Sequence, residues 1–97
     1  MAASLSTHVL DTGQGAPARE VKVELYREDE LVAEGSTDDD GRIAGFADAL
    51  EPGRYRLVFH PPSPYFTRVE LEVDLGDGHH HVPLLVSPYA CASYRGS

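Results

Sequence analysis

The chain has 97 residues, with 8 Lys and Arg against 16 Asp and Glu and a formal net charge of −8 at pH 7. This length fits one domain over residues 1–97, and the negative charge would repel nucleic acid and anionic membrane surfaces. No apolar run approaches the roughly 20 residues that cross a bilayer, and the first residues lack the pattern of a signal peptide. Cys91 is the single cysteine, which favours a reducing compartment, so we expect a cytoplasmic protein with no membrane partner.

Hydrophobic residues alternate with polar ones along most of the chain, in short runs separated by Gly, Pro and Asp. This period of two is typical of strands with one buried face. In chain order, the runs predict strands over residues 5–11, 21–26, 31–36, 42–46, 54–60, 67–75 and 80–86, and a last strand that ends near Tyr94.

No segment shows convincing helical spacing, and three prolines between residues 60 and 66 leave no room for a regular helix there. Seven to eight short strands with regular turn signals indicate an all-β sandwich or barrel with little or no helix.

Alternation in the first predicted strand separates its side chains into two sets. If Leu5, Thr7 and Val9 face the core, His8 lies on the outer face of its sheet with Ser6 and Leu10.

The same argument applies near the end of the chain. There Val82, Leu84 and Val86 would face the core, and the outer face would carry His81, Pro83 and Leu85. Two histidines bordered by apolar residues on an outer face indicate a surface that a partner subunit covers.

Three segments of the sequence resemble signatures of the 5-hydroxyisourate hydrolases, which belong to the transthyretin-like family. The first is Ser6-Thr7-His8-Val9-Leu10-Asp11-Thr12, and the second, shorter one is Asp40-Gly41-Arg42. The third runs from His81-Val82-Pro83-Leu84-Leu85-Val86-Ser87-Pro88-Tyr89 to Tyr94-Arg95-Gly96-Ser97. Transthyretin itself is similar at Ser87-Pro88-Tyr89 but lacks the first histidine and the Tyr-Arg-Gly-Ser ending.

The resemblance implies a two-sheet, prealbumin-like sandwich that forms a homotetramer, with active sites in a channel between dimers. It implies hydrolysis of 5-hydroxyisourate to 2-oxo-4-hydroxy-4-carboxy-5-ureidoimidazoline during urate degradation, without a cofactor or metal. The implied catalytic residues are His8, Arg42, His81 and Ser97, and the implied substrate contacts are His8, Arg42, Tyr94 and Ser97.

The chemistry of these side chains fits that reaction. Histidine supplies a base with a pKa near neutrality for a water that attacks an acyl carbon. Arg42 is permanently charged and planar, which suits it to hold an oxo-purine edge and to stabilise oxyanion charge. The free carboxylate of Ser97 is expected to pair with Arg95 or another neighbouring group, and its hydroxyl to orient the attacking water.

Other readings of the polar clusters are less favourable. A metal tract at His79-His80-His81 is weakly supported, because only His79 and His81 share a face of a strand. We expect His79 and His80 to be solvated residues at a strand edge. Asp38-Asp39-Asp40-Gly41 lacks the ligand spacing of a calcium loop and predicts a turn. Cys91 is expected on the core face with Tyr89 and Ser93, as an inert buried thiol.

Two functions other than hydrolysis remain open. One is a transthyretin-like carrier of a small ligand in the same channel, and the other is a structural sandwich module. Loss of the Tyr-Arg-Gly-Ser ending would favour the carrier, and flanking domains would favour the module.

Overall fold

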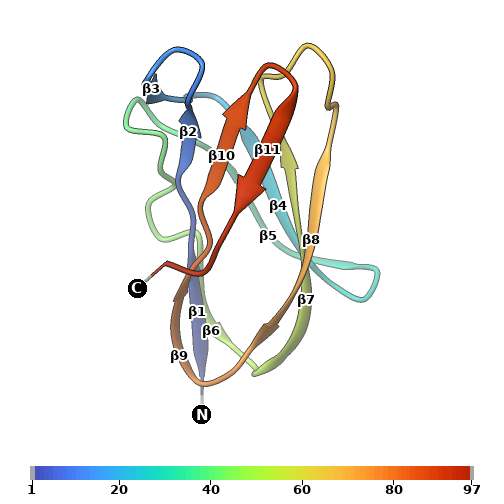
Figure 1. Cartoon of the computed structure of the whole chain (residues 1–97). Coiled ribbons are helices and arrows are strands. Elements are labelled where there is room, and N and C mark those ends of the chain that lie inside the picture. Colours follow the sequence, from blue (N-terminus) through green and yellow to red (C-terminus); the bar gives the residue numbers. More distant parts are fainter. Residues whose placement is uncertain (1, 97) are drawn as a thin grey trace.

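A computed structural model, which describes residues 2–96, shows two β layers packed face to face (Figure 1). Within these residues there is no helix, and therefore none long and apolar enough to span a membrane. The all-β prediction and the absence of a helix in the Pro-rich segment at 60–66 are confirmed over this range.

The first layer carries the candidate site and is built from two short sheets. One sheet has the order β6-β1-β9 and the other β11-β10-β2-β3. Its strands are β1 (Ala3–Ser6), β2 (Val9–Asp11), β3 (Ala16–Pro17), β6 (Ala47–Leu50), β9 (Gly78–His81), β10 (Leu84–Ser87) and β11 (Ala90–Ser93).

The two sheets are continuous because the chain runs directly from β1 into β2 and from β9 into β10. Across these breaks the amide of Val82 donates to the carbonyl of Ser6 (3.0 Å), and that of Leu84 to the carbonyl of His8 (2.8 Å). β1 pairs with β9, and β2 with β10, in parallel. The beginning of the chain therefore lies beside its C-terminal quarter.

The second layer is an antiparallel sheet with the order β5-β4-β7-β8. Its strands are β4 (Lys22–Arg27), β5 (Glu30–Ser36), β7 (Gly53–His60) and β8 (Val69–Leu75).

The core lies between the layers and contains the alternate residues that the sequence pattern predicts. Leu5, Val9, Leu84 and Val86 come from the first layer, and the second contributes the buried residues Val23, Leu25, Tyr55, Leu57, Phe59 and Leu75. Each fully buried aliphatic or aromatic side chain stabilises the fold by roughly 1.5–3 kcal/mol relative to exposure. This burial fixes which face of β1 and β9 points outward.

Three predicted strands differ from the structure, apart from strand ends that shift by one or two residues. The strands predicted at 5–11 and 80–86 are each broken in the middle, the second at Pro83, which has no N–H to donate to a ladder. The strand predicted at 42–46 is wrong. There Arg42 forms only an isolated bridge, and a turn with Gly45 at φ 59° precedes β6.

Candidate active site

His8 follows β1 and lies on the outward face of the first layer, as the alternation predicts. Thr7 and Val9 on either side of it are buried, whereas His8 is half-buried. Its Nε2–H donates to the backbone carbonyl of Asp40 at 2.8 Å. Since a neutral imidazole carries one proton, this bond leaves Nδ1 of His8 as the nitrogen with a free lone pair.

His81 ends β9 on the same outward face and is also half-buried. Its Nδ1 forms a hydrogen bond of 2.7 Å with Oγ of Ser6. Burial lowers the pKa of His81 below its usual value of 6.5, and the nearby Arg42, His8 and His79 lower it further. His81 is therefore predominantly neutral at pH 7, with Nε2 directed away from Ser6.

Arg42 is brought to the histidines by the turn at residues 38–41. Asp38 accepts hydrogen bonds at its Oδ1 from the amides of Asp40 (2.9 Å) and Arg42 (3.0 Å), which fixes the turn predicted there. Arg42 then forms an antiparallel bridge with His8. Its charge depresses the pKa of His81, so the three residues that the motifs singled out converge on one surface.

Gly41 makes that approach possible. Its φ of 75° lies in the left-handed region, and a Cβ there would lie 2.5 Å from the carbonyl oxygen of Val9 and 3.1 Å from Cδ2 of His8. Only glycine allows the turn to close against β2 and the imidazole.

The C-terminal tail runs back across His81. The amide of Gly96 donates to the carbonyl of His81 at 2.6 Å. Ser97, predicted to be catalytic, lies outside the described residues. Tyr94 is 57% exposed and lines a shallow depression beside β8 with Leu71 and Val73, so its predicted contact with the substrate is not apparent within one chain.

Three placements near the site differ from the sequence-based expectations. His80 is buried, at 8% exposure, and its Nε2–H donates to the carbonyl of Gly76 at 2.9 Å, so it is not a solvated edge residue. Pro83, in the break between β9 and β10, is fully buried instead of lying on the outer face. Tyr89 is 73% exposed in a turn instead of on the core face.

Cys91 is half-buried against the core, and burial raises the pKa of its thiol. A raised pKa keeps the thiol protonated at pH 7, which agrees with the expected inert cysteine.

Sequence reasoning missed the roles of Ser6 and His79. Both nitrogens of His79 are engaged, Nδ1 with Oγ of Ser4 (2.7 Å) and Nε2 with Oγ of Ser6 (2.8 Å). The sequence does place Ser4 and Ser6 on one face of one strand, and His79 and His81 on one face of another. The pairing of these two strands was needed to interpret this placement.

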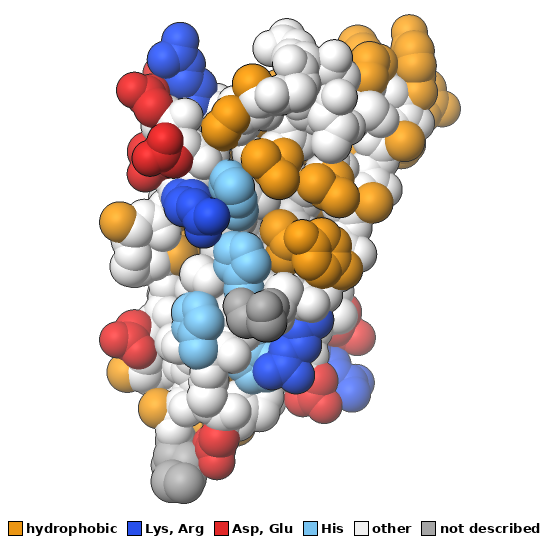
Figure 2. All heavy atoms as spheres, turned by 60° about the vertical axis from the view of Figure 1, so that its left-hand side comes forward, with side chains coloured by type: hydrophobic (Ala, Val, Ile, Leu, Met, Phe, Trp, Pro, Cys, Tyr) orange, Lys and Arg blue, Asp and Glu red, His pale blue; other side chains and the backbone are white. Residues whose placement is uncertain are grey.

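Polar and apolar side chains lie on different sides of the site. Figure 2 shows histidine side chains gathered in a column, with a basic side chain on one side and an apolar area on the other. On the sheet β11-β10-β2-β3, the outward residues next to this column are Leu10, Leu85, Ala90 and Ala92. Over residues 2–96, no group of three or more His, Cys, Asp or Glu residues is arranged to hold a metal ion.

The fold is a β sandwich that displays His8, His81 and Arg42 on one sheet face, and comparison with known proteins shows which family has this arrangement. A model of the HIUase/Transthyretin family matches residues 5–96, and the chain belongs to this family.

Individual relatives agree with this assignment. The 5-hydroxyisourate hydrolase of Pseudomonas aeruginosa is 38% identical over 116 residues, which cover 96% of this chain and 90% of the relative. The structure of Klebsiella pneumoniae 5-hydroxyisourate hydrolase matches with a TM-score of 0.89 and 41% identity, covering 97% of this chain and 99% of the other. Transthyretin from Sparus aurata matches with a TM-score of 0.85 at 24% identity, over 95% of each chain, and this likeness concerns the fold alone.

Proposed function

We propose that this chain is a hydrolase that opens the six-membered ring of 5-hydroxyisourate in urate degradation. The observation that carries the proposal is the convergence of His8, Arg42 and His81 on one outward face. Relatives that match nearly the whole chain bear the name of this activity. The transthyretin-like carrier has only a likeness of fold in its favour.

The proposed reaction adds water across a cyclic amide C–N bond. His81 takes a proton from the water through Nε2 while the oxygen attacks the acyl carbon. Arg42 stabilises the charge that develops on the carbonyl oxygen, and the leaving ring nitrogen receives a proton as the C–N bond breaks. His8, which the carbonyl of Asp40 orients, fixes the substrate through Nδ1.

The lowered pKa of His81 suits this role at neutral pH. A base must be unprotonated to accept a proton, and burial together with the charge of Arg42 keeps His81 in that form. Arg42 therefore acts on the substrate and on the base.

Ser97 and Tyr94 complete the proposed site at the end of the tail. Ser97 is the next residue after Gly96, whose amide donates to the carbonyl of His81, and we assign to its hydroxyl the role of orienting the attacking water. Replacement of Ser97 by Ala tests this role. A variant with wild-type kcat would remove Ser97 from the catalytic set.

We also propose that the chain forms a homotetramer and acts in the cytoplasm. The outward apolar residues Leu10, Leu85, Ala90 and Ala92 would meet a second copy, so that the site lies in a channel between dimers. A channel would also provide a wall that faces Tyr94 and the histidines. The unpaired Cys91 is compatible with a reducing compartment.

The decisive experiment follows the absorbance of freshly generated 5-hydroxyisourate with and without protein, because the compound also decays unaided. Faster decay at catalytic protein concentrations is expected. Decay at the unaided rate would exclude the hydrolase function.

A further inference from the structure

Two neighbouring strands carry matching pairs of serines and histidines beside the proposed base. β1 and β9 are parallel, and their register places Ser4 opposite His79 and Ser6 opposite His81. Because side chains two residues apart share a face of a strand, all four point outward from the first layer.

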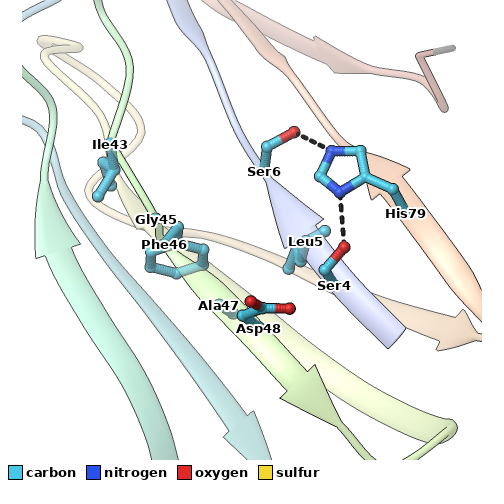
Figure 3. Close-up of a pocket in the computed structure, with 9 residues that line it drawn as sticks. All are labelled: Ser4, Leu5, Ser6, Ile43, Gly45, Phe46, Ala47, Asp48 and His79. Atoms are coloured by element: carbon cyan, nitrogen blue, oxygen red, sulfur yellow. Dashed lines mark hydrogen bonds between the residues drawn. The ribbon is translucent and has the colours of Figure 1, made fainter. Parts of the chain in front are cut away.

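These side chains form one continuous chain of hydrogen bonds. It runs from Oγ of Ser4 to Nδ1 of His79 (2.7 Å), from Nε2 of His79 to Oγ of Ser6 (2.8 Å), and from Oγ of Ser6 to Nδ1 of His81 (2.7 Å). Figure 3 shows the ring of His79 held between the two serine hydroxyls. Each distance is that of a well-formed hydrogen bond.

The relay requires the Ser6 hydroxyl to donate one of its two bonds and accept the other. Because each neutral imidazole has one N–H, all three bonds then point in the same direction, and two arrangements are possible. If they point away from His81, its Nδ1–H donates to Ser6 and Nε2 is free to accept a proton. If they point toward His81, Ser6 donates to Nδ1 and the proton of His81 is on Nε2.

One concerted shift converts the first arrangement into the second. When Nε2 of His81 takes a proton from water, the Nδ1 proton passes to Ser6 and the Ser6 proton to Nε2 of His79. The Nδ1 proton of His79 then passes to Ser4, and the Ser4 proton to solvent. His81 is left neutral with a proton on Nε2. It donates this proton to the leaving nitrogen while the reverse shift returns one proton from solvent to Nδ1, so the ring stays neutral.

The surroundings favour export of the proton in this direction. His81 is half-buried and faces the charge of Arg42 and the imidazole of His8, so an imidazolium there is disfavoured. His79 is exposed and lines a hollow of about 260 Å³ that Asp48 also lines. The hydrogen-bonded chain therefore leads from His81, where positive charge is disfavoured, to the open hollow that the carboxylate of Asp48 also lines.

We propose that Ser6 and His79 are positioning residues that set the tautomer of His81 and relay its proton to solvent through Ser4. This proposal deepens the hydrolase function and rests on it. It also explains why a strand-edge histidine has both ring nitrogens bonded to serines.

The first test needs no activity. Two-dimensional ¹⁵N NMR of the imidazoles reports the tautomer of His81 in the wild type and in Ser6→Ala and Ser6→Thr. The tautomer ratio of His81 is expected to change in Ser6→Ala and to return toward the wild-type ratio in Ser6→Thr, which keeps the hydroxyl. His60, on the other layer, serves as an internal reference. An unchanged ratio in Ser6→Ala would overturn the proposal.

The second test is kinetic and uses His79→Ala, with His60→Ala as the matched control. His79→Ala is expected to lower kcat by about 10-fold with little change in KM, less than loss of a direct acid–base group. Added imidazole, a mobile proton carrier, is expected to restore part of that kcat and to leave the control unaffected.

Wild-type kcat in His79→Ala, or a loss of kcat that imidazole does not restore in a folded variant, would refute the relay. If the wild-type protein does not hydrolyse 5-hydroxyisourate, the proposed function fails. The NMR result on Ser6→Ala then still decides whether the serine sets the protonation of His81.

Discussion

The amide of Gly96 donates to the carbonyl of His81 at 2.6 Å, and this bond holds the tail against the imidazole ring. A Cβ on Gly96 would lie 2.6 Å from Cδ2 of that ring and 3.3 Å from its Cγ. The residue before Ser97 thus has no room for a side chain unless the proposed base moves.

Gly96→Ala should therefore reduce hydrolysis while the sandwich stays folded. The added methyl must displace either the ring of His81 or the tail, and a small misplacement of a catalytic group is costly. We expect a loss of kcat on the order of 10²-fold, measured by the decay of 5-hydroxyisourate, with an unchanged circular dichroism spectrum. Gly76→Ala is the control, because a Cβ there meets nothing within 4 Å. Equal activity in the two variants would contradict this account of the tail.

Removal of either outward histidine should abolish most of the activity. His8→Ala and His81→Ala are each expected to lower kcat by about 10²-fold or more, the usual contribution of acid–base catalysis. His60→Ala is the matched control, since His60 ends β7 in the other layer and bonds Glu24. A folded His8 or His81 variant with the kcat of His60→Ala would remove that histidine from the mechanism.

The pH dependence of kcat/KM should show an acid limb below the usual histidine range. Burial and the charge of Arg42 lower the pKa of His81 from its usual 6.5, so His81 stays unprotonated until the pH falls to this lowered pKa. Arg42→Gln removes a positive charge and should move the pKa of His81 upward, measured by NMR titration. A downward shift would have the wrong sign for this electrostatic role.

Gly41→Ala should cost stability as well as activity. The left-handed φ of 75° and the 2.5 Å approach to the carbonyl of Val9 together are expected to cost roughly 2–4 kcal/mol in urea denaturation. Gly45→Ala is the paired control, because φ is 59° there but a Cβ meets nothing within 4 Å. That variant should lose only about 1–2 kcal/mol, from backbone strain. Similar losses of stability in the two variants would mean that the close contact between residue 41 and β2 adds nothing to the cost of the substitution.

The proposed tetramer can be tested at its apolar face. Ala92 is exposed on β11 and pairs with Leu85 on β10, so Ala92→Glu places a charge on the surface that should bury a second copy. Light scattering is expected to report a smaller assembly for this variant and a tetramer for the wild type. A monomeric wild type would exclude the channel.

Several features of the fold and site could be predicted from the sequence because they depend on local periodicity. Alternation along Leu5, Thr7 and Val9 is enough to place His8 outward, since successive strand residues point to opposite faces. The Asp38–Gly41 turn likewise follows from residue types that favour turns. Breaks in strands were less predictable, because Pro83 and the Gly45 turn act through backbone geometry that a two-residue period does not encode.

The sequence by itself singled out His8, Arg42 and His81, the residues proposed to carry the chemistry, and predicted that both histidines face outward. Only the tertiary structure decided how they are held. Ser6 and His81 are 75 positions apart, and they meet because β1 and β9 pair in a parallel register that residue patterns do not specify. The approach of Gly96 to His81 is equally non-local. Both contacts depend on strand order across the sheet, which is selected by packing of the whole core rather than by any one segment.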